Sequence, residues 1–256
     1  VKTFGRRIDD MVINPAIGMK FALGENPKTV YNEKNAAPMT RMATASLIRE
    51  QLKKAERYLD DKERADEEED YDLPEYDAKC EALIPVLERE QKAFFHAHRA
   101  DDIFTAIRIA KEFKLDYVIV HCTEGHLIRD ILAAEKVKAI AGPILCDRSK
   151  PELKNLSVEG PALLHEAGIH AALCTDHPVI PIQYLPLCAG LCVGAGLEKE
   201  EALKAITIYA AEAAGIDDKV GSLAPGKDAD LVIYKEDADP CGPYARPSMV
   251  FINGQQ

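Results

Sequence analysis

The chain has 256 residues, of which 47% are hydrophobic, and its formal net charge is −11 at pH 7. This length allows one large α/β barrel or two modest domains. The acidic balance argues against a nucleic-acid-binding surface, because phosphate groups are neutralised by clustered lysine and arginine.

Cysteine usage and the start of the chain bear on its cellular setting. Seven cysteines are scattered without a Cys-x-x-Cys pair, which is typical of reduced thiols, so we expect a cytoplasmic protein. No apolar run is long enough to cross a bilayer and no signal-peptide pattern is present, so no membrane partner is expected. Because the chain begins without methionine, in sequence typical of a domain interior, we expect an N-terminal segment to precede Val1.

The first third of the chain predicts one strand followed by two helices. The strand is expected over 19–23, where Gly24 ends it. The helices are expected over 38–59 and 76–91, with a solvated acidic run between them. We interpret the two helices as a hairpin inserted over about 36–91 between units of a barrel.

A regular alternation of strands and helices follows. Further strands are predicted over 92–98, 116–122, 137–145 and 169–177. Helices are predicted over 100–114, 125–136, 159–168, 184–196 and 198–215. Repeated strand–helix units with apolar strands predict a parallel sheet, and their number favours a (β/α)8 barrel of the TIM type over an open sheet. The barrel would be incomplete in this chain and would occupy residues 1–219.

The tail changes character after the last helix. Glycine and proline turns surround two short strands, predicted within 230–234 and 247–254. We expect residues 220–256 to form part of a small β domain at the C-terminus.

Polar side chains stand where three of the predicted strands end. His96 and His98 end one strand, His121 ends the next, and Asp176 and His177 end the last. In parallel α/β proteins these ends meet at one edge, where reactive groups gather. Residues two apart on a strand face the same side, so His96 and His98 should point the same way. Imidazoles and a carboxylate at one barrel mouth predict a zinc-type site.

Each of these residues taken alone has a simpler interpretation. A single histidine such as His121 at a strand end is more often a structural hydrogen-bonding residue. Asp176 could cap a turn or a helix. His165 is interpreted as a helix-surface residue and His170 as the start of a strand. The joint occurrence at three strand ends favours the metal site.

Several longer stretches carry a resemblance to a known family. They are "GMKFALGENPK" (18–28), "HAHRADDI" (96–103), "VIVHCTEGH" (118–126), "LCTDHP" (173–178) and "GSLAPGKDADLVIY" (221–234). With them the chain resembles the amidohydrolase superfamily, and within it the imidazolonepropionase-like metal-dependent amidohydrolases. The resemblance covers nearly the whole chain.

The resemblance implies a set of metal ligands. His96 matches the ligand after the fifth barrel strand and His121 the ligand after the sixth. Asp176 matches the aspartate after the eighth strand, which binds metal and exchanges a proton with the attacking water. Either Lys20, as a metal-bridging carboxylated lysine, or Glu25 would supply the ligand of the fourth-strand region. The cofactor implied is one or two divalent metal ions, most simply zinc.

The resemblance also implies a reaction and its surroundings. His98, Arg99 and His177 would be substrate-facing or supporting groups around the hydrolysis of a carbon–nitrogen bond in a small amide or cyclic amide. The alternatives are a deaminase on the same scaffold and a catalytically inactive binding subunit, and metal content separates the last from the enzymes. The superfamily's first-strand His-x-His pair is not found, so we expect the chain to be a C-terminal portion. Its protein partner would be the N-terminal segment or further copies of itself.

Overall fold

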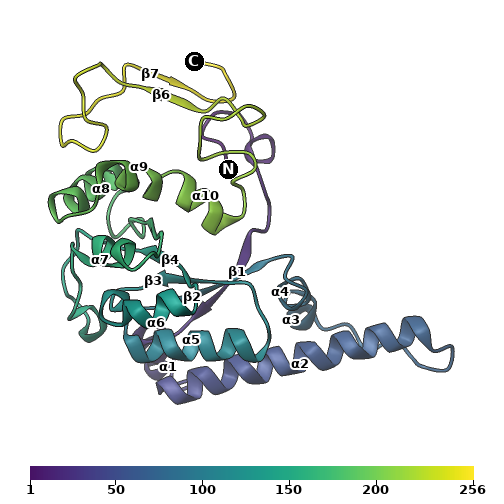
Figure 1. Ribbon diagram of the computed structural model, residues 1–256. Coiled ribbons are helices and arrows are strands. Elements are labelled where there is room, and N and C mark those ends of the chain that lie inside the picture. Colours follow the sequence, from purple (N-terminus) through teal and green to yellow (C-terminus); the bar gives the residue numbers. More distant parts are fainter.

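A five-stranded parallel sheet organises the molecule (Figure 1). The computed structural model describes residues 1–256, and the strands follow the order β1-β2-β3-β4-β5. Their bounds are Gly18–Ala22 for β1, Lys92–Ala97 for β2, Tyr117–His121 for β3, Lys138–Ala141 for β4 and Ala172–Leu173 for β5. The parallel pairing confirms the expected α/β class, with β1 and β5 as the edges of the sheet.

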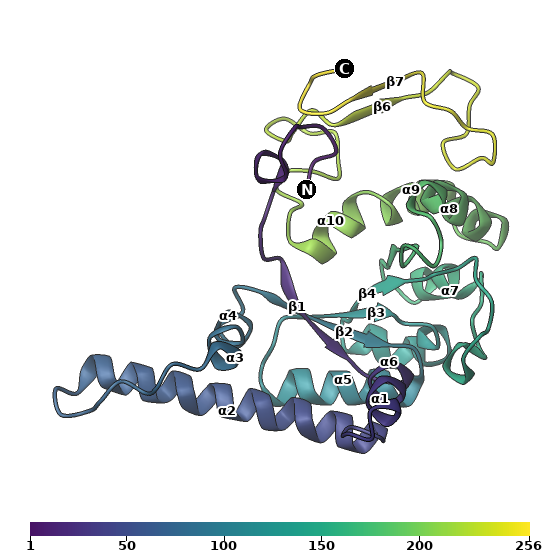
Figure 2. The same cartoon turned by 180° about the vertical axis from the view of Figure 1, so that it is seen from behind.

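Helices lie on both sides of this sheet. Their bounds are Glu25–Glu33 (α1), Arg41–Glu67 (α2), Ala78–Glu81 (α3), Ile84–Leu87 (α4), Ala100–Glu112 (α5), Arg129–Ala134 (α6), Gly160–Glu166 (α7), Leu185–Gly194 (α8), Lys199–Ala205 (α9) and Ile208–Ala214 (α10). The chain also contains four short 3-10 helices, at Ile8–Met11, Gly125–Ile128, Pro151–Leu153 and Ile182–Tyr184. In both ribbon views α2, α5 and α6 lie on one side of the sheet, and α8 to α10 lie on the other (Figures 1 and 2).

Strand alternation divides the side chains of the sheet between two faces. Phe21 and Phe95 stack with their ring centroids 4.9 Å apart, and Phe95 is completely buried. They pack under the helix layer with Ile103 and Ile109 of α5. Because successive side chains of a strand point to opposite faces, His96 lies on the other face from Phe95. One face of the sheet thus packs into the hydrophobic core, and the other face carries polar side chains such as His96.

The segment between β1 and β2 differs from the expected pair of long helices. Helix α2 runs to Glu67 and takes up part of the acidic run, but the second helix is reduced to the two short helices α3 and α4. Pro85 stands in the first turn of α4. A proline offers no N–H and its ring clashes with the carbonyl four residues earlier, so one continuous helix through this point is disfavoured.

The two ends of the chain lie close together, beside the small hairpin of β6 (Leu231–Ile233) and β7 (Met249–Phe251) (Figure 2). The hairpin is antiparallel. Lys2 forms ion pairs with Asp228, at 2.8 Å, and with Asp230. None of the helices combines the length and apolar character required to span a membrane.

Candidate metal centre

Three histidines meet at the carboxyl ends of β2 and β3. The ring centroid of His96 lies 4.8 Å from that of His98 and 4.4 Å from that of His121. The rings of His98 and His121 stack with their centroids 4.6 Å apart. Each histidine offers one ring nitrogen to a group whose members all lie within 4.8 Å of one another. We call these three residues the histidine cluster.

Local backbone geometry brings His121 into the cluster. The register pairs His121 with Ala97, so a regular strand would place its side chain on the face opposite His96. The backbone of His121 has a φ of 75° instead, outside the strand region. Its Nδ1 lies 2.7 Å from the carbonyl oxygen of Gly142. The ring of His121 therefore lies beside His96 and His98, because its backbone leaves strand geometry and its Nδ1 is bonded to Gly142.

Burial keeps the imidazoles neutral. His96, His98 and His121 are at most 4% exposed. Burial, reinforced by the nearby His121, lowers the pKa of His96 to about 3 and that of His98 to about 2. Burial also lowers the pKa of His121, against the opposing influence of its hydrogen bond to Gly142 and of Asp176. Neutral imidazoles carry a free lone pair, the form that binds metal ions.

A cavity of about 580 Å³ opens beside the cluster. His96 and His98 line it, and Asp176 lies on its wall. Further polar side chains of the lining are those of Asn26, Asp147, Ser149 and Lys150. Asp176 is exposed and has a φ of 50°. The structure therefore brings the candidate carboxylate to the same cavity as two of the candidate histidines.

Lys20 and Glu25, the two candidates from the first strand region, lie in different surroundings. Ala22 pairs with His96 in the sheet, so Lys20, two residues earlier, faces the same side as His96. The positive charge of Lys20 contributes to the lowered pKa of His96, after burial and His121. The structure thus places Lys20 on the face of the sheet that carries His96.

The carboxylate of Glu25 is held by basic side chains instead. Its Oε1 lies 2.9 Å from a guanidinium nitrogen of Arg41, and its Oε2 lies 3.2 Å from the ammonium of Lys28. Although burial opposes the shift, the hydrogen bonds from Lys28 and Arg41 lower the pKa of Glu25. These partners keep Glu25 outside the histidine cluster.

Arg99 and His177 also lie apart from the cluster. The guanidinium of Arg99 pairs with Asp101 at 2.9 Å, and its side chain is 42% exposed. His177 is exposed in the chain segment that follows β5, and it is not among the residues that line the cavity. Asp101 and Asp102 stand in the first turn of α5, where carboxylates suit the positive end of the helix dipole.

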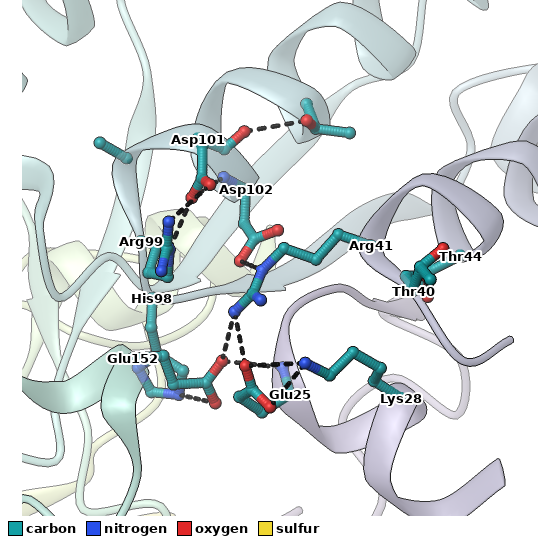
Figure 3. A network of polar contacts seen from close by, with 12 residues as sticks. Glu25, Lys28, Thr40, Arg41, Thr44, His98, Arg99, Asp101, Asp102 and Glu152 are labelled. Carbon is teal, nitrogen blue, oxygen red and sulfur yellow. Dashed lines mark hydrogen bonds and ion pairs between the residues drawn. The ribbon is translucent and has the colours of Figure 1, made fainter. Parts of the chain in front are cut away.

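A buried polar network supports the cluster from the side of α1 and α2 (Figure 3). Glu152 is completely buried, and its Oε1 lies 3.8 Å from Nε2 of His98. Its Oε2 accepts a hydrogen bond of 2.8 Å from the backbone N–H of Glu25. Arg41 lies 3.0 Å from a carboxylate oxygen of Asp102 and 3.8 Å from Glu152. The network links His98 to three elements that are distant in sequence.

Sequence reasoning missed the main supporting residues. Glu152 stands in an irregular stretch after β4, and Arg41 begins an ordinary surface helix, so neither gave a signal. Thr123, whose Oγ1 lies 2.7 Å from Nδ1 of His98, did lie in one of the quoted motifs. A threonine two residues after a strand-end histidine is the signal that could have identified it.

The donor atoms present fit a divalent metal. Nδ1 of His96 is buried and has no hydrogen-bond partner. Such an orphaned nitrogen costs free energy unless a ligand satisfies it. Imidazoles with a nearby carboxylate are a typical donor set for zinc with an open coordination position. His96 and His121 are the residues that fit this role best, with Asp176 at the cavity wall.

Comparisons with known proteins agree with this picture. The family described as "Amidohydrolase family" matches residues 87–256. Amidohydrolase tasK of Hapsidospora irregularis is 28% identical over 249 residues, which are 92% of this chain. The imidazolonepropionase of Geobacillus kaustophilus (strain HTA426) is 49% identical over 74 residues, which are 28% of this chain. These matches confirm the resemblance that the motifs indicated.

A solved structure extends the comparison to the fold. The crystal structure of an amidohydrolase from Thermotoga maritima MSB8 superposes with a TM-score of 0.93 and 40% identity, covering 97% of this chain and 64% of that chain. The match to tasK spans 25% of that protein and the match to the imidazolonepropionase spans 18%. The likeness confirms the expected α/β barrel architecture, of which the five parallel strands are a part.

Proposed function

The chain belongs to the amidohydrolase family, and we propose that it contributes the histidine cluster and Asp176 to a metal-dependent hydrolase that cleaves a carbon–nitrogen bond. The substrate class we propose is a small amide or cyclic amide. The observation that carries this proposal is the meeting of His96, His98 and His121 beside the cavity that Asp176 lines. Zinc is the metal we propose, because imidazole and carboxylate donors suit it.

His96 and His121 would hold the metal, together with Asp176. A divalent ion bound there would lower the pKa of a water molecule and so supply a nucleophile near neutral pH. Of the two remaining candidates, we propose Lys20 in a carboxylated form, whose carbamate oxygens can bind metal, rather than Glu25, because the carboxylate of Glu25 is already bound by Arg41 and Lys28.

Asp176 would move the proton. Its carboxylate is exposed at the cavity wall, where it can accept a proton from the attacking water and pass it to the departing nitrogen. The same group then acts as base and as acid. A positioned general acid–base group typically contributes about 10²- to 10⁴-fold to the rate.

His98 would hold the substrate. Its Nδ1 contacts the hydroxyl of Thr123, whereas its Nε2 lies 3.8 Å from Glu152, too far for a hydrogen bond, so Nε2 is the nitrogen left for the substrate. It also lines the cavity, where a neutral imidazole can hydrogen-bond the substrate carbonyl. The side chains of His177 and Arg99 are exposed, and we propose that they face the substrate.

The test is a substrate panel with matched aspartate variants. The full-length protein that contains this chain is loaded with ZnCl₂ and assayed on N-acyl amino acids, dipeptides and cyclic amides, and ammonia release from amino-heterocycles tests the deaminase alternative. Asp176→Asn should lower kcat at least about 100-fold. Asp147→Asn changes another exposed carboxylate of the same cavity and should keep kcat within about tenfold. Equal losses in the two variants, or no turnover by the zinc-loaded full-length protein on any substrate, would refute the proposal.

A further inference from the structure

A second group of metal-ligand side chains lies away from the histidine cluster. His165 stands near the end of α7, His170 just before β5, and Glu201 in α9. Their donor atoms all lie within 4.8 Å of one another. His170 precedes β5 whereas Asp176 follows it, so this group lies at the amino end of the strand and the catalytic cavity at the carboxyl end.

The distances within this group are too long for good hydrogen bonds. Nδ1 of His165 lies 3.5 Å from Oε2 of Glu201, and Nδ1 of His170 lies 3.7 Å from the same oxygen. Donor–acceptor distances of strong N–H···O bonds are about 2.9 Å. Ligands held tetrahedrally at about 2.1 Å from a zinc ion are separated by about 3.4 Å. The distances between these donor atoms are thus close to those between two ligands of one zinc ion.

One donor atom lacks any partner. Nδ1 of His165 is buried and accepts or donates no hydrogen bond. A buried imidazole nitrogen in this state costs free energy that a bound cation would offset. Its nearest carboxylate is Glu201, so the orphaned nitrogen faces an anionic group that would also ligate the ion.

Neighbouring groups orient the carboxylate. The hydroxyl of Tyr209 donates to Oε2 of Glu201 at 2.6 Å, and Lys204 donates to Oε1 at 2.9 Å. The ring of Tyr209 also packs against that of His170, with centroids 5.0 Å apart. Lys204 also forms an ion pair with Glu200, at 2.8 Å. Two carboxylates thus share one ammonium, and the net charge of these three groups is negative. Metal ligands are commonly held by such outer partners.

We propose that His165, His170 and Glu201 bind a divalent transition-metal ion of the zinc class. The ion links α7, the entry to β5 and α9, and a water molecule completes its coordination. Because the three ligands come together only in the folded chain, the ion stabilises the native state. This site is separate from the catalytic cavity, and the proposal does not depend on the reaction proposed above.

The test counts zinc equivalents in matched glutamate variants. The chain is stripped with a chelator and titrated with ZnCl₂, and bound zinc is counted after dialysis. Glu201→Gln should bind one equivalent fewer than the unaltered chain. Glu200→Gln removes the other carboxylate partner of Lys204 and should bind the same number as the unaltered chain. Unchanged stoichiometry in Glu201→Gln, or an equal loss in Glu200→Gln, overturns the site.

Two more variants guard against a folding defect and test the outer partner. The His170 side chain is 53% exposed, so His170→Gln should fold normally, and it should also lose one equivalent. Tyr209→Phe removes the hydroxyl that orients Glu201 and should raise the Kd of that equivalent at least about tenfold. A folded His170→Gln variant, checked by circular dichroism, that retains every equivalent with unchanged Kd overturns the proposal.

Discussion

His121 donates a hydrogen bond from Nδ1 to the carbonyl oxygen of Gly142 over 2.7 Å. A carbonyl oxygen can only accept, so the proton of the neutral ring sits on Nδ1 and the lone pair on Nε2. Backbone carbonyls commonly fix metal-binding histidines in this way. The geometry therefore prepares His121 as a ligand through Nε2.

Replacement of His121 should remove one zinc equivalent from the catalytic cavity. His121→Ala deletes the prepared nitrogen, so zinc counted after dialysis should fall by one equivalent or bind much more weakly. His177→Ala changes an exposed histidine of the segment after β5 and is the control, which should keep all its zinc. If both variants retain the same zinc content, His121 is not a ligand.

Arg41 should matter more for stability than its neighbour on the same helix. Arg41 faces three carboxylates, including Asp102 and the completely buried Glu152. Arg41→Met leaves buried negative charge without compensation, which should lower the free energy of unfolding by about 3 kcal/mol. The measurement is urea unfolding followed by circular dichroism.

Arg49 supplies the comparison for this prediction. It also lies on α2 and pairs with Glu112 at 2.6 Å, but both side chains are at least 34% exposed. Surface ion pairs contribute little, so Arg49→Met should change the free energy of unfolding by less than about 1 kcal/mol. Equal losses in the two variants would mean that the buried network does not depend on Arg41.

The parallel strands could be predicted because each is a short apolar run between turn signals. The expected strands all overlap the observed ones, but β5 covers only Ala172–Leu173 of the nine residues expected at 169–177. Residues that follow the last paired position leave the strand conformation, as the φ of 50° at Asp176 shows. Pairing with a neighbour fixes strand length, and local sequence holds little information about it.

The histidines could be identified for a related reason. Strand ends are visible in the sequence, and parallel strands place those ends together, so the meeting of His96, His98 and His121 was predictable. The burial of Glu152 was not, because an acidic residue in an irregular stretch is usually exposed. The group of His165, His170 and Glu201 was not predictable either, because the three residues are distant in sequence and only the fold brings them together.

Acid should destabilise the metal-free chain through the buried histidines. The pKa of His96 falls from 6.5 to about 3 on burial and that of His98 to about 2, so between these values and 6.5 the unfolded chain binds more protons than the folded one. The contribution of these neutral rings to the free energy of unfolding is therefore complete above pH 6.5. It is lost as the pH falls, by up to about 1.4 kcal/mol per pH unit for each histidine.

Urea unfolding in the presence of a chelator, from pH 7 to pH 5.5, measures this loss. The window lies above the range in which most carboxylates take up protons, so histidines dominate it. His98→Asn removes one titrating ring and should reduce the slope by about 1.4 kcal/mol per pH unit. A free energy of unfolding that stays constant across the window would show that the rings are protonated in the folded chain.

The shape of Glu152 should matter more than its charge. Burial raises the pKa of Glu152, so ionisation of this side chain opposes folding instead of favouring it. Its Oε2 nevertheless accepts the backbone N–H of Glu25, and its other oxygen lies beside His98. Glu152→Gln keeps an acceptor of the same shape and should lower the free energy of unfolding by less than about 1 kcal/mol. Glu152→Ala leaves the N–H of Glu25 unpaired beside a cavity and should cost about 2 to 4 kcal/mol. Urea unfolding of both variants decides the matter, and a glutamine variant as unstable as the alanine variant would show that the charge itself holds the network together.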